Sequence, residues 1–285
     1  AFQDGSTNPA NHPYTITTAI VLDGIMDALA SRSLWSADDR ERIRGLAGRV
    51  VVRWCREVWS DGYGGGFFWY SPNPADATFA VNTPSMFLGS MVRLMHEHPE
   101  AFSAEERRLV EGRADAQARA IVSTAQMRGG SPFWDYMALP NPRNIRRPND
   151  LIHHVYTMMG IETYRDFGEK VRLPWTRSGA LRSLDTFWAD GQIRHFPQDV
   201  DYSGEQASIG RQPAILWDVG TLLAGYARWA DWNGAARTIE AIQHDYGPIP
   251  DLRLRPKNTS PDLSFYPRQA AHVLWGLALY AYGPG

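Results

Sequence analysis

Apolar and polar residues along this chain follow two different helical patterns. Segments of the first kind are apolar on most faces, which is typical of helices that pack on several sides. They are 15–31, 84–97, 149–167, 213–230 and 265–282. Segments of the second kind combine charged clusters with apolar stripes, which indicates one solvent-facing side. They are 37–59, 103–128, 178–188 and 233–246. The alternation predicts inner helices paired with outer helices.

Short aromatic stretches that end in proline precede the inner helices, and we expect each to form a strand. They read FFWYSPNP (67–74), FWDYMALPNP (133–142), IRHFPQD (193–199) and IPDLRLRP (249–256). Each predicted inner helix also begins at a proline, which suits the first turn because a helix cannot bond the missing N–H there. These prolines are Pro13, Pro84, Pro148, Pro213 and Pro267.

This unit of helix, aromatic strand, polar loop and helix recurs at roughly 50 to 70 residues, which is longer than common solenoid repeats. We therefore expect an all-α fold, an incomplete (α/α) toroid of helical hairpins with short aromatic β-strands in the loops, formed by a single domain over 1–285. A glycine inside each inner helix predicts close helix packing, because glycine costs about 1 kcal/mol against alanine there. These glycines are Gly24, Gly89, Gly160, Gly220 and Gly276.

The net charge and the hydropathy of the chain exclude some classes of binding partner. A formal net charge of −2 argues against nucleic-acid binding through phosphate contacts. No apolar run has membrane-spanning length, so we expect no membrane insertion. The single cysteine, Cys55, lies in an apolar segment and is expected to be a buried structural thiol. A first residue other than methionine suits removal of a signal peptide, and we expect a periplasmic or secreted protein.

Polar residues gather where the inner helices begin. In a ring of hairpins all inner helices run the same way, so their N-termini meet at one mouth and favour an anionic ligand. The residues expected to bind substrate are His12, Tyr14, Trp69, Tyr70, Asn82, Trp134, Asp135, Asn149, Arg211, Asp218 and Arg268. The expected catalytic residues are His153, Tyr156, Tyr266 and His154.

The two adjacent histidines are not equivalent. Neighbours on a helix point about 100° apart, so only one of His153 and His154 can face the mouth. Tyr156 lies three residues after His153 and shares its face. His96 and His98 lack the spacing of a zinc site. We predict no metal site and no cofactor.

Three kinds of function compete. A glycosidase needs two carboxyl groups, for which Asp135, Asp150, Asp218 and Asp262 are candidates. The mouth is instead rich in histidine, tyrosine, asparagine and arginine, and this set suits proton abstraction beside a carboxylate. That chemistry belongs to a polysaccharide lyase or a uronyl epimerase. A toroid that binds an exopolysaccharide without catalysis is the third alternative.

Two segments and a strand resemble a known family. NDLIHHVYTMMGIETYRDFGE, RQPAILWDVGTLLAGYARWAD and the preceding ADGQIRHFPQD are similar to the α/α-toroid domain of D-glucuronyl C5-epimerases and related bacterial exopolysaccharide-biosynthesis proteins. The resemblance implies an acidic polysaccharide or oligosaccharide as substrate. In that family and in toroidal polysaccharide lyases, tyrosine, histidine, asparagine and arginine handle the uronate. The matching residue types are Tyr266, His153, Asn82 and Arg268.

A second resemblance concerns GGGFFWYSP (64–72), which looks like a segment of N-acylglucosamine 2-epimerase-like toroids. Those proteins act on free sugars with a histidine acid/base pair. Here the pair would come from His12, His153, His154, His195 and His272.

Overall fold

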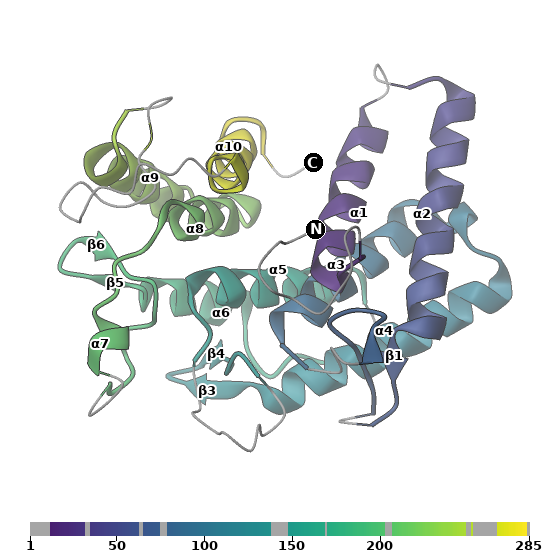
Figure 1. The fold of residues 1–285 in the computed structure, drawn as a ribbon, viewed down its shortest axis with the longest axis horizontal. Coiled ribbons are helices and arrows are strands. Elements are labelled where there is room, and N and C mark those ends of the chain that lie inside the picture. The colour runs from purple at the N-terminus through teal and green to yellow at the C-terminus, as the bar shows by residue number, and fades with distance from the viewer. Residues whose placement is uncertain are drawn as a thin grey trace. The chain divides into compact units, whose positions relative to one another are not determined.

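The protein is mostly helical in a computed structural model, which confirms the all-α prediction. The structure describes residues 12–31, 35–62, 65–74, 79–137, 148–168, 170–202, 207–248, 252 and 267–283. The helices are α1 (Thr15–Ala30), α2 (Ala37–Glu57), α3 (Asn82–Glu97), α4 (Ala104–Thr124), α5 (Leu151–Phe167), α6 (Arg177–Asp185), α7 (Ala207–Gly210), α8 (Leu216–Arg228), α9 (Trp232–Ala241) and α10 (Pro267–Tyr282), with short 3-10 and π turns at Pro99–Ala101 and Ile242–Tyr246. Figure 1 shows their order along the chain.

The strands pair as three antiparallel hairpins in the described part of the chain. They are β1 (Trp59–Ser60) with β2 (Phe67–Phe68), β3 (Gln126–Arg128) with β4 (Ser131–Phe133), and β5 (Trp188–Ala189) with β6 (Gln192–Ile193). Each hairpin follows an outer helix and precedes an inner one. The repeated unit is therefore an outer helix, a β-hairpin and an inner helix.

The sequence located only the second strand of each hairpin. The predicted outer helices 37–59, 103–128 and 178–188 were too long, because their last residues form the first strands. The turns explain where two of these helices must stop. Gly129 and Gly130 have φ of 55° and 83°, and Asp190 and Gly191 have φ of 53° and 74°. Two consecutive positive φ values are what a tight two-residue hairpin turn requires.

The predicted strands were also too long. Only Phe67–Phe68 and Phe133 of the first two aromatic stretches are in strands, while 249–256 falls outside the described residues except for Leu252. The prolines that were predicted to begin the inner helices more often lie before the first helical residue than in the first turn. Pro267 begins α10, but Pro148 and Pro213 precede the first residues of α5 and α8, Leu151 and Leu216.

Two pairs of contacting inner helices run parallel, α3 with α5 and α8 with α10. A Cβ on Gly89 would meet Gly160, so α3 and α5 cross at these glycines. A Cβ on Gly220 would overlap the backbone of His272 and Val273, which brings α8 against α10. The prediction fails for Gly24, where an added Cβ would meet no atom within 4 Å. Close packing thus explains four of the five glycines.

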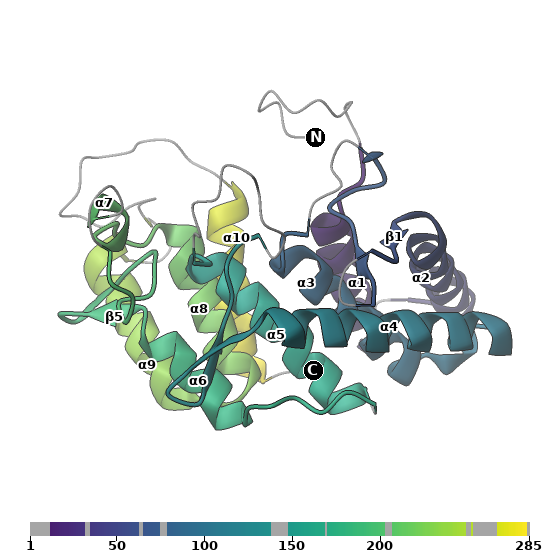
Figure 2. The ribbon, with the colours of Figure 1, turned by 90° about the horizontal axis from the view of Figure 1, so that it is seen from below.

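The chain divides into two compact units, and each is described by itself. Unit 1 comprises Ala1–Ala125, Trp134–Arg147 and Tyr156–Pro174. Unit 2 comprises Gln126–Phe133, Pro148–Val155 and Trp175–Gly285. In unit 2, α8 packs against both α9 and α10, and Figure 2 shows these helices side by side. Among the described helices, none combines the length and the apolar character needed to cross a membrane.

The core of unit 1 is aromatic. Phe87 of α3 packs against Trp54 of α2 and Phe68 of β2, with ring centroids 6.2 and 4.8 Å away. Cys55 is buried beside them, and burial raises its thiol pKa to about 12. The thiol stays protonated at neutral pH, which fits the structural role expected from the sequence.

Candidate functional site

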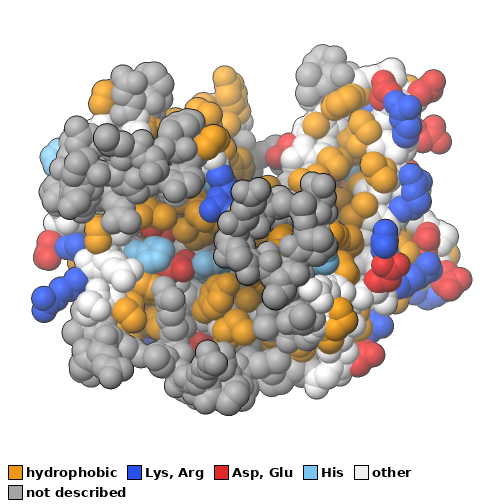
Figure 3. Space-filling model, in the orientation of Figure 1, with side chains coloured by type: hydrophobic (Ala, Val, Ile, Leu, Met, Phe, Trp, Pro, Cys, Tyr) orange, Lys and Arg blue, Asp and Glu red, His pale blue; other side chains and the backbone are white. Residues whose placement is uncertain are grey.

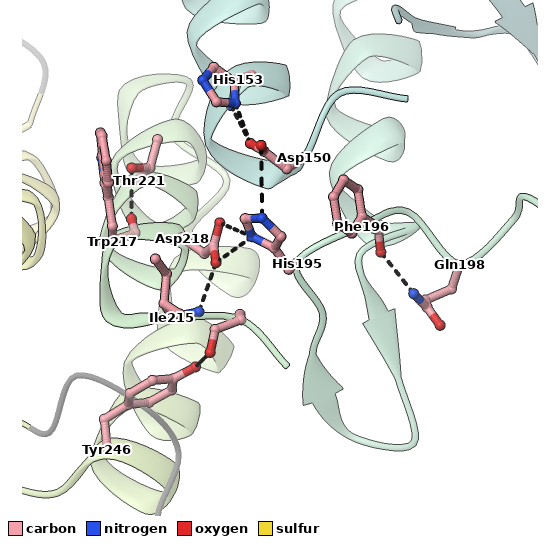
Figure 4. Close-up of polar contacts among 11 residues, drawn as sticks. Asp150, His153, His195, Phe196, Gln198, Ile215, Trp217, Asp218, Thr221 and Tyr246 are labelled. Carbon is pink, nitrogen blue, oxygen red and sulfur yellow. Dashed lines mark hydrogen bonds and ion pairs between the residues drawn. The ribbon is translucent and has the colours of Figure 1, made fainter. Parts of the chain in front are cut away.

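In unit 2, the loop that follows β6 connects the starts of α5 and α8. The Leu151 backbone N–H donates to the carbonyl of His195 at 2.8 Å, and the His195 N–H donates to the carbonyl of Gln212 at 3.0 Å. The Ala214 N–H donates to the carbonyl of Ile193 at 3.2 Å. These bonds hold His195 between the N-termini of two inner helices (Figure 4).

Four side chains form a continuous cluster at this point. His153 Nδ1 lies 2.6 Å from Asp150 Oδ1, and His195 Nε2 lies 3.8 Å from Asp150 Oδ2. His195 Nδ1 lies 2.9 and 2.8 Å from the two carboxylate oxygens of Asp218. We call His153, Asp150, His195 and Asp218 the His–Asp cluster. Figure 4 shows the two histidines on opposite sides of Asp150.

The helices hold both aspartates by their backbones. Asp150 caps α5, because its Oδ1 accepts the His153 N–H at 3.1 Å and its carbonyl accepts the His154 N–H. Asp218, in the first turn of α8, reaches back to accept the Ile215 N–H at 2.7 Å. Helix N-termini stabilise negative charge, so both carboxylates lie where a helix favours them.

Burial affects the two carboxyl groups differently. Asp218 is fully buried, and burial raises its pKa although the contact with His195 opposes the rise. Burial also raises the pKa of Asp150, but the hydrogen bond from His153 and the nearby charges of His153 and His195 outweigh it and lower the pKa. Asp150 is therefore negatively charged at neutral pH.

The cluster is reached from solvent through its histidines. The side chains of His153 and His195 are 26% and 18% exposed, whereas that of Asp150 is 11% exposed. Figure 3 shows histidine and acidic side chains next to each other on the visible face of the molecule. A ligand would therefore meet imidazoles first, with the carboxylates behind them.

His154 has a packing role despite its place in the predicted catalytic set. Its Nε2 lies 2.6 Å from Ser183 Oγ, and its ring centroid lies 5.4 Å from those of Phe133 and Phe187. Burial, with a smaller effect of the Arg128 charge, lowers its pKa to about 3. This neutral, enclosed imidazole differs from its exposed neighbour His153, as the 100° step between them predicted.

The structure describes one of the two predicted catalytic tyrosines, Tyr156. Tyr156 is 2% exposed and belongs to unit 1. Tyr266 and Asp262 lie outside the described residues. The sequence missed Tyr246, whose buried hydroxyl donates to the carbonyl of Ala214 at 2.6 Å and supports the approach to α8.

The other predicted residues of unit 2 stand near the helix starts. Asn149 is buried directly before Asp150, and Arg211 is exposed in the segment that leads to α8. The Arg268 guanidinium stacks on Trp217, 3.9 Å from the ring centroid. Trp217 is in the first turn of α8 and Arg268 in that of α10, so the N-termini of these helices are adjacent.

The remaining predicted residues belong to unit 1. They are His12, Tyr14, Trp69, Tyr70, Asn82, Trp134 and Asp135. The ring of Tyr14 contacts those of His12 and Tyr70, with centroids 5.6 and 5.5 Å away. Trp134 is 1% exposed and donates to the carbonyl of Ile121, which makes it a core residue. Asn82 is likewise buried, at the start of α3.

Sequence reasoning named every member of the His–Asp cluster but did not assemble it. Asp150 was named as a candidate glycosidase carboxyl group, and His195 as one of several histidines. The available signal was a histidine inside the aromatic stretch 193–199, followed by a helix with aspartate in its first turn. A spacing of 45 residues between Asp150 and His195 gives no indication of their contact.

Unit 1 contains a separate polar pocket of about 220 Å³. Tyr164 Oη donates to Asp115 Oδ1 at 2.6 Å, and Lys170 Nζ lies 3.3 Å from Asp115 Oδ2. Tyr164 Oη also accepts the Val171 N–H, and burial raises the phenol pKa. A phenol that stays protonated and ties a loop to a helix is better explained as structural than as reactive.

Comparisons with protein-family models, with curated proteins and with solved structures found no match for this chain. The argument for function therefore depends on the site itself.

Proposed function

We propose that this protein is a carbohydrate-active enzyme that abstracts the proton beside the carboxylate of a uronate, as a polysaccharide lyase or a uronyl epimerase. The observation that carries the proposal is the 2.6 Å contact between the partly exposed His153 and Asp150 at the start of α5. A partly exposed imidazole backed by a charged carboxylate is a common arrangement for a general base.

The geometry gives His153 a defined role. Donation from Nδ1 to Asp150 fixes one tautomer and makes Nε2 the basic atom. The negative charge of Asp150 stabilises the imidazolium formed when His153 takes a proton. General acid/base catalysis of this kind contributes about 10² to 10⁴-fold to a rate.

Arg268 is the proposed partner of the uronate carboxylate. Its guanidinium stacks by its face on Trp217, and an arginine held in this way can present its N–H edge to a planar carboxylate. Offsetting the substrate charge lowers the cost of the negative charge that develops on proton abstraction. The parallel inner helices support the proposal that the helical hairpins are arranged as an incomplete toroid.

A second candidate is a free-sugar epimerase or isomerase, which the histidine pair favours. His153 and His195 approach the two oxygens of one carboxylate, Asp150, at 2.6 and 3.8 Å. Two histidines near one substrate carbon could remove and return a proton. Hydrolysis by Asp150 and Asp218 is less well supported, since Asp218 is fully buried behind His195.

The test is solvent-proton exchange in D₂O, followed by NMR, with uronate polysaccharides and oligosaccharides and with free sugars. Incorporation of deuterium beside the carboxylate, or the ultraviolet absorbance of a new double bond, would support the first candidate. Exchange only in a free sugar would support the second. Reducing ends released without either signal would mean hydrolysis and contradict both.

The critical variant is His153→Gln, for which we expect a rate loss of about 100-fold or more. His244→Gln is the matched control, because His244 is an 87% exposed histidine of the same unit that contacts Asp245. Equal activity of the two variants would refute the role given to His153.

A further inference from the structure

The geometry points to a divalent transition-metal site, of the kind that takes Zn²⁺ or Mn²⁺, with His195 Nε2 and Asp150 Oδ2 as ligands. The inference goes beyond the proposed function and does not require it. It also departs from the sequence, which predicted no metal. One ligand atom from each of Asp150, His195 and Asp218 can be chosen so that all three lie within 4.8 Å of one another.

The tautomer of His195 is the first step. Both oxygens of Asp218 lie within 2.9 Å of His195 Nδ1, and Asp218 Oδ2 already accepts the Ile215 N–H. A carboxylate in this position accepts, so Nδ1 carries the proton and donates it. A neutral His195 then directs a lone pair from Nε2 toward Asp150.

The separation between the two proposed ligand atoms is the second step. His195 Nε2 and Asp150 Oδ2 are 3.8 Å apart, beyond hydrogen-bond range. Two ligands with metal bonds of about 2.1 Å at the tetrahedral angle are about 3.4 Å apart. The pair therefore needs to close by only about 0.4 Å to hold one ion.

The surroundings of both ligands are the third step. Metal-binding histidines almost always donate their other ring N–H to a carboxylate or carbonyl, as His195 does to Asp218. Ligating carboxylates are also held by hydrogen bonds, as Asp150 is by the His153 side chain and backbone. Both supports come from helix N-termini, which are rigid elements.

Charge and ligand type select the kind of ion. Asp150 is 9% exposed and Asp218 is fully buried, and two carboxyl groups enclosed this closely favour a cation. Imidazole together with carboxylate suits zinc or manganese, whereas Mg²⁺ and Ca²⁺ prefer oxygen ligands alone. Water, or a carboxylate or hydroxyl of a sugar, would complete the coordination.

The experiment measures binding of Zn²⁺, Mn²⁺ and Mg²⁺ to the EDTA-treated, dialysed protein by calorimetry and by metal analysis after equilibrium dialysis, without substrate. We expect one equivalent of Zn²⁺ or Mn²⁺ to bind and Mg²⁺ to bind at least tenfold more weakly. His195→Gln and Asp150→Asn should remove this binding. Asp218→Asn, which alters the support of His195 without removing either proposed ligand, should weaken it by about 10 to 100-fold.

The matched control is the double variant His244→Gln, Asp245→Asn. It removes another histidine–aspartate contact of the same unit, at 2.8 Å, and should bind the metal like the unaltered protein. Absence of saturable Zn²⁺ and Mn²⁺ binding would overturn the inference. Binding that survives both His195→Gln and Asp150→Asn would overturn it equally.

A measurement on the unaltered protein covers the case in which these variants fail to fold. In histidine ¹⁵N spectra, Zn²⁺ should shift the Nε2 resonance of one histidine whose Nδ1 remains protonated, and no such shift would overturn the site. Because these readouts need no substrate, metal binding without proton exchange would contradict only the proposed function. Exchange by a protein that binds no metal would contradict only the metal site.

Discussion

The start of α1 in unit 1 and the start of α5 in unit 2 have the same backbone arrangement with different side chains. The Thr15 N–H, at the first residue of α1, donates to the carbonyl of Tyr70 at 3.0 Å. The Leu151 N–H, at the first residue of α5, donates to the carbonyl of His195 at 2.8 Å. In both cases the acceptor lies two residues after a hairpin strand.

The two helix starts differ in the residue that precedes the helix. In unit 1 Tyr14 precedes α1 and packs edge-on against Tyr70, with ring centroids 5.5 Å apart. In unit 2 Asp150 precedes α5 and faces His195 at 3.8 Å. The repeated scaffold fixes where the two side chains meet, and the residue types decide whether the meeting is an aromatic contact or an ionisable one. The first predictions concern stability, where unit 2 should be the more sensitive.

The largest expected effect is that of acid on unit 2. In the folded chain the pKa of His154 is lowered to about 3 from 6.5. Between these two pH values His154 therefore binds a proton in the unfolded chain but not in the folded chain. The stability that this contributes is present above pH 6.5 and is lost as the pH falls, by up to about 1.4 kcal/mol per pH unit. Urea unfolding at a series of pH values measures this slope, and His154→Gln should flatten it.

The described histidines of unit 1 are at least partly exposed. They are His12, His96 and His98. The protection factors of amides in α8, which correct exchange rates for the intrinsic effect of pH, should therefore fall in mild acid before those in α1. An equal fall in the two helices would contradict the assignment of acid sensitivity to unit 2.

The next effect is that of Asp218→Ala. The change leaves the His195 imidazole and the Ile215 N–H without their buried carboxylate partner. We expect the free energy of unfolding to fall by about 3 kcal/mol, because breaking a buried pair from one side is costly. Equilibrium urea unfolding measures it. A loss no larger than that of Asp61→Ala, whose side chain is 81% exposed, would show that the buried contact contributes little.

A third, smaller effect compares two glycines that lie inside inner helices. Gly220→Ala places a Cβ against the backbone of His272 and Val273, and overpacking of this kind costs about 1 to 3 kcal/mol. Gly24→Ala, in α1, meets nothing within 4 Å and should stabilise by up to about 1 kcal/mol. Thermal unfolding of the two variants should shift in opposite directions, and a shift of the same sign would refute the packing assigned to α8 and α10.

Local patterns predicted more of the fold than of the site. Helical periodicity located the helices because it depends on neighbours in the sequence, and α1 and α5 begin within two residues of the expected positions. The first strand of each hairpin was missed because two or three residues carry too little pattern. The contact of His195 with Asp150 depends on a loop that joins two helices, and only the assembled backbone reveals it.

The smallest expected change in stability comes from Asp150→Asn, and it separates the two roles of this residue. As a cap, asparagine is about as good as aspartate, so the free energy of unfolding should change by less than about 1 kcal/mol. The same change removes the negative charge that supports His153, so proton exchange with substrate should fall by about 100-fold.

Ser103→Ala should have the opposite pair of effects, a loss of stability without a loss of proton exchange. Measured together, the two variants separate the effect of a helix cap from the effect of a group that takes part in the proposed chemistry. Ser103 caps α4 in unit 1 through the Glu106 N–H, and its loss should cost about 1 kcal/mol with no change in exchange. Urea unfolding and deuterium incorporation, measured on both variants, provide the test. If Asp150→Asn kept full activity, the carboxylate would be only a cap, and the start of α5 would differ from that of α1 in residue type without differing in function.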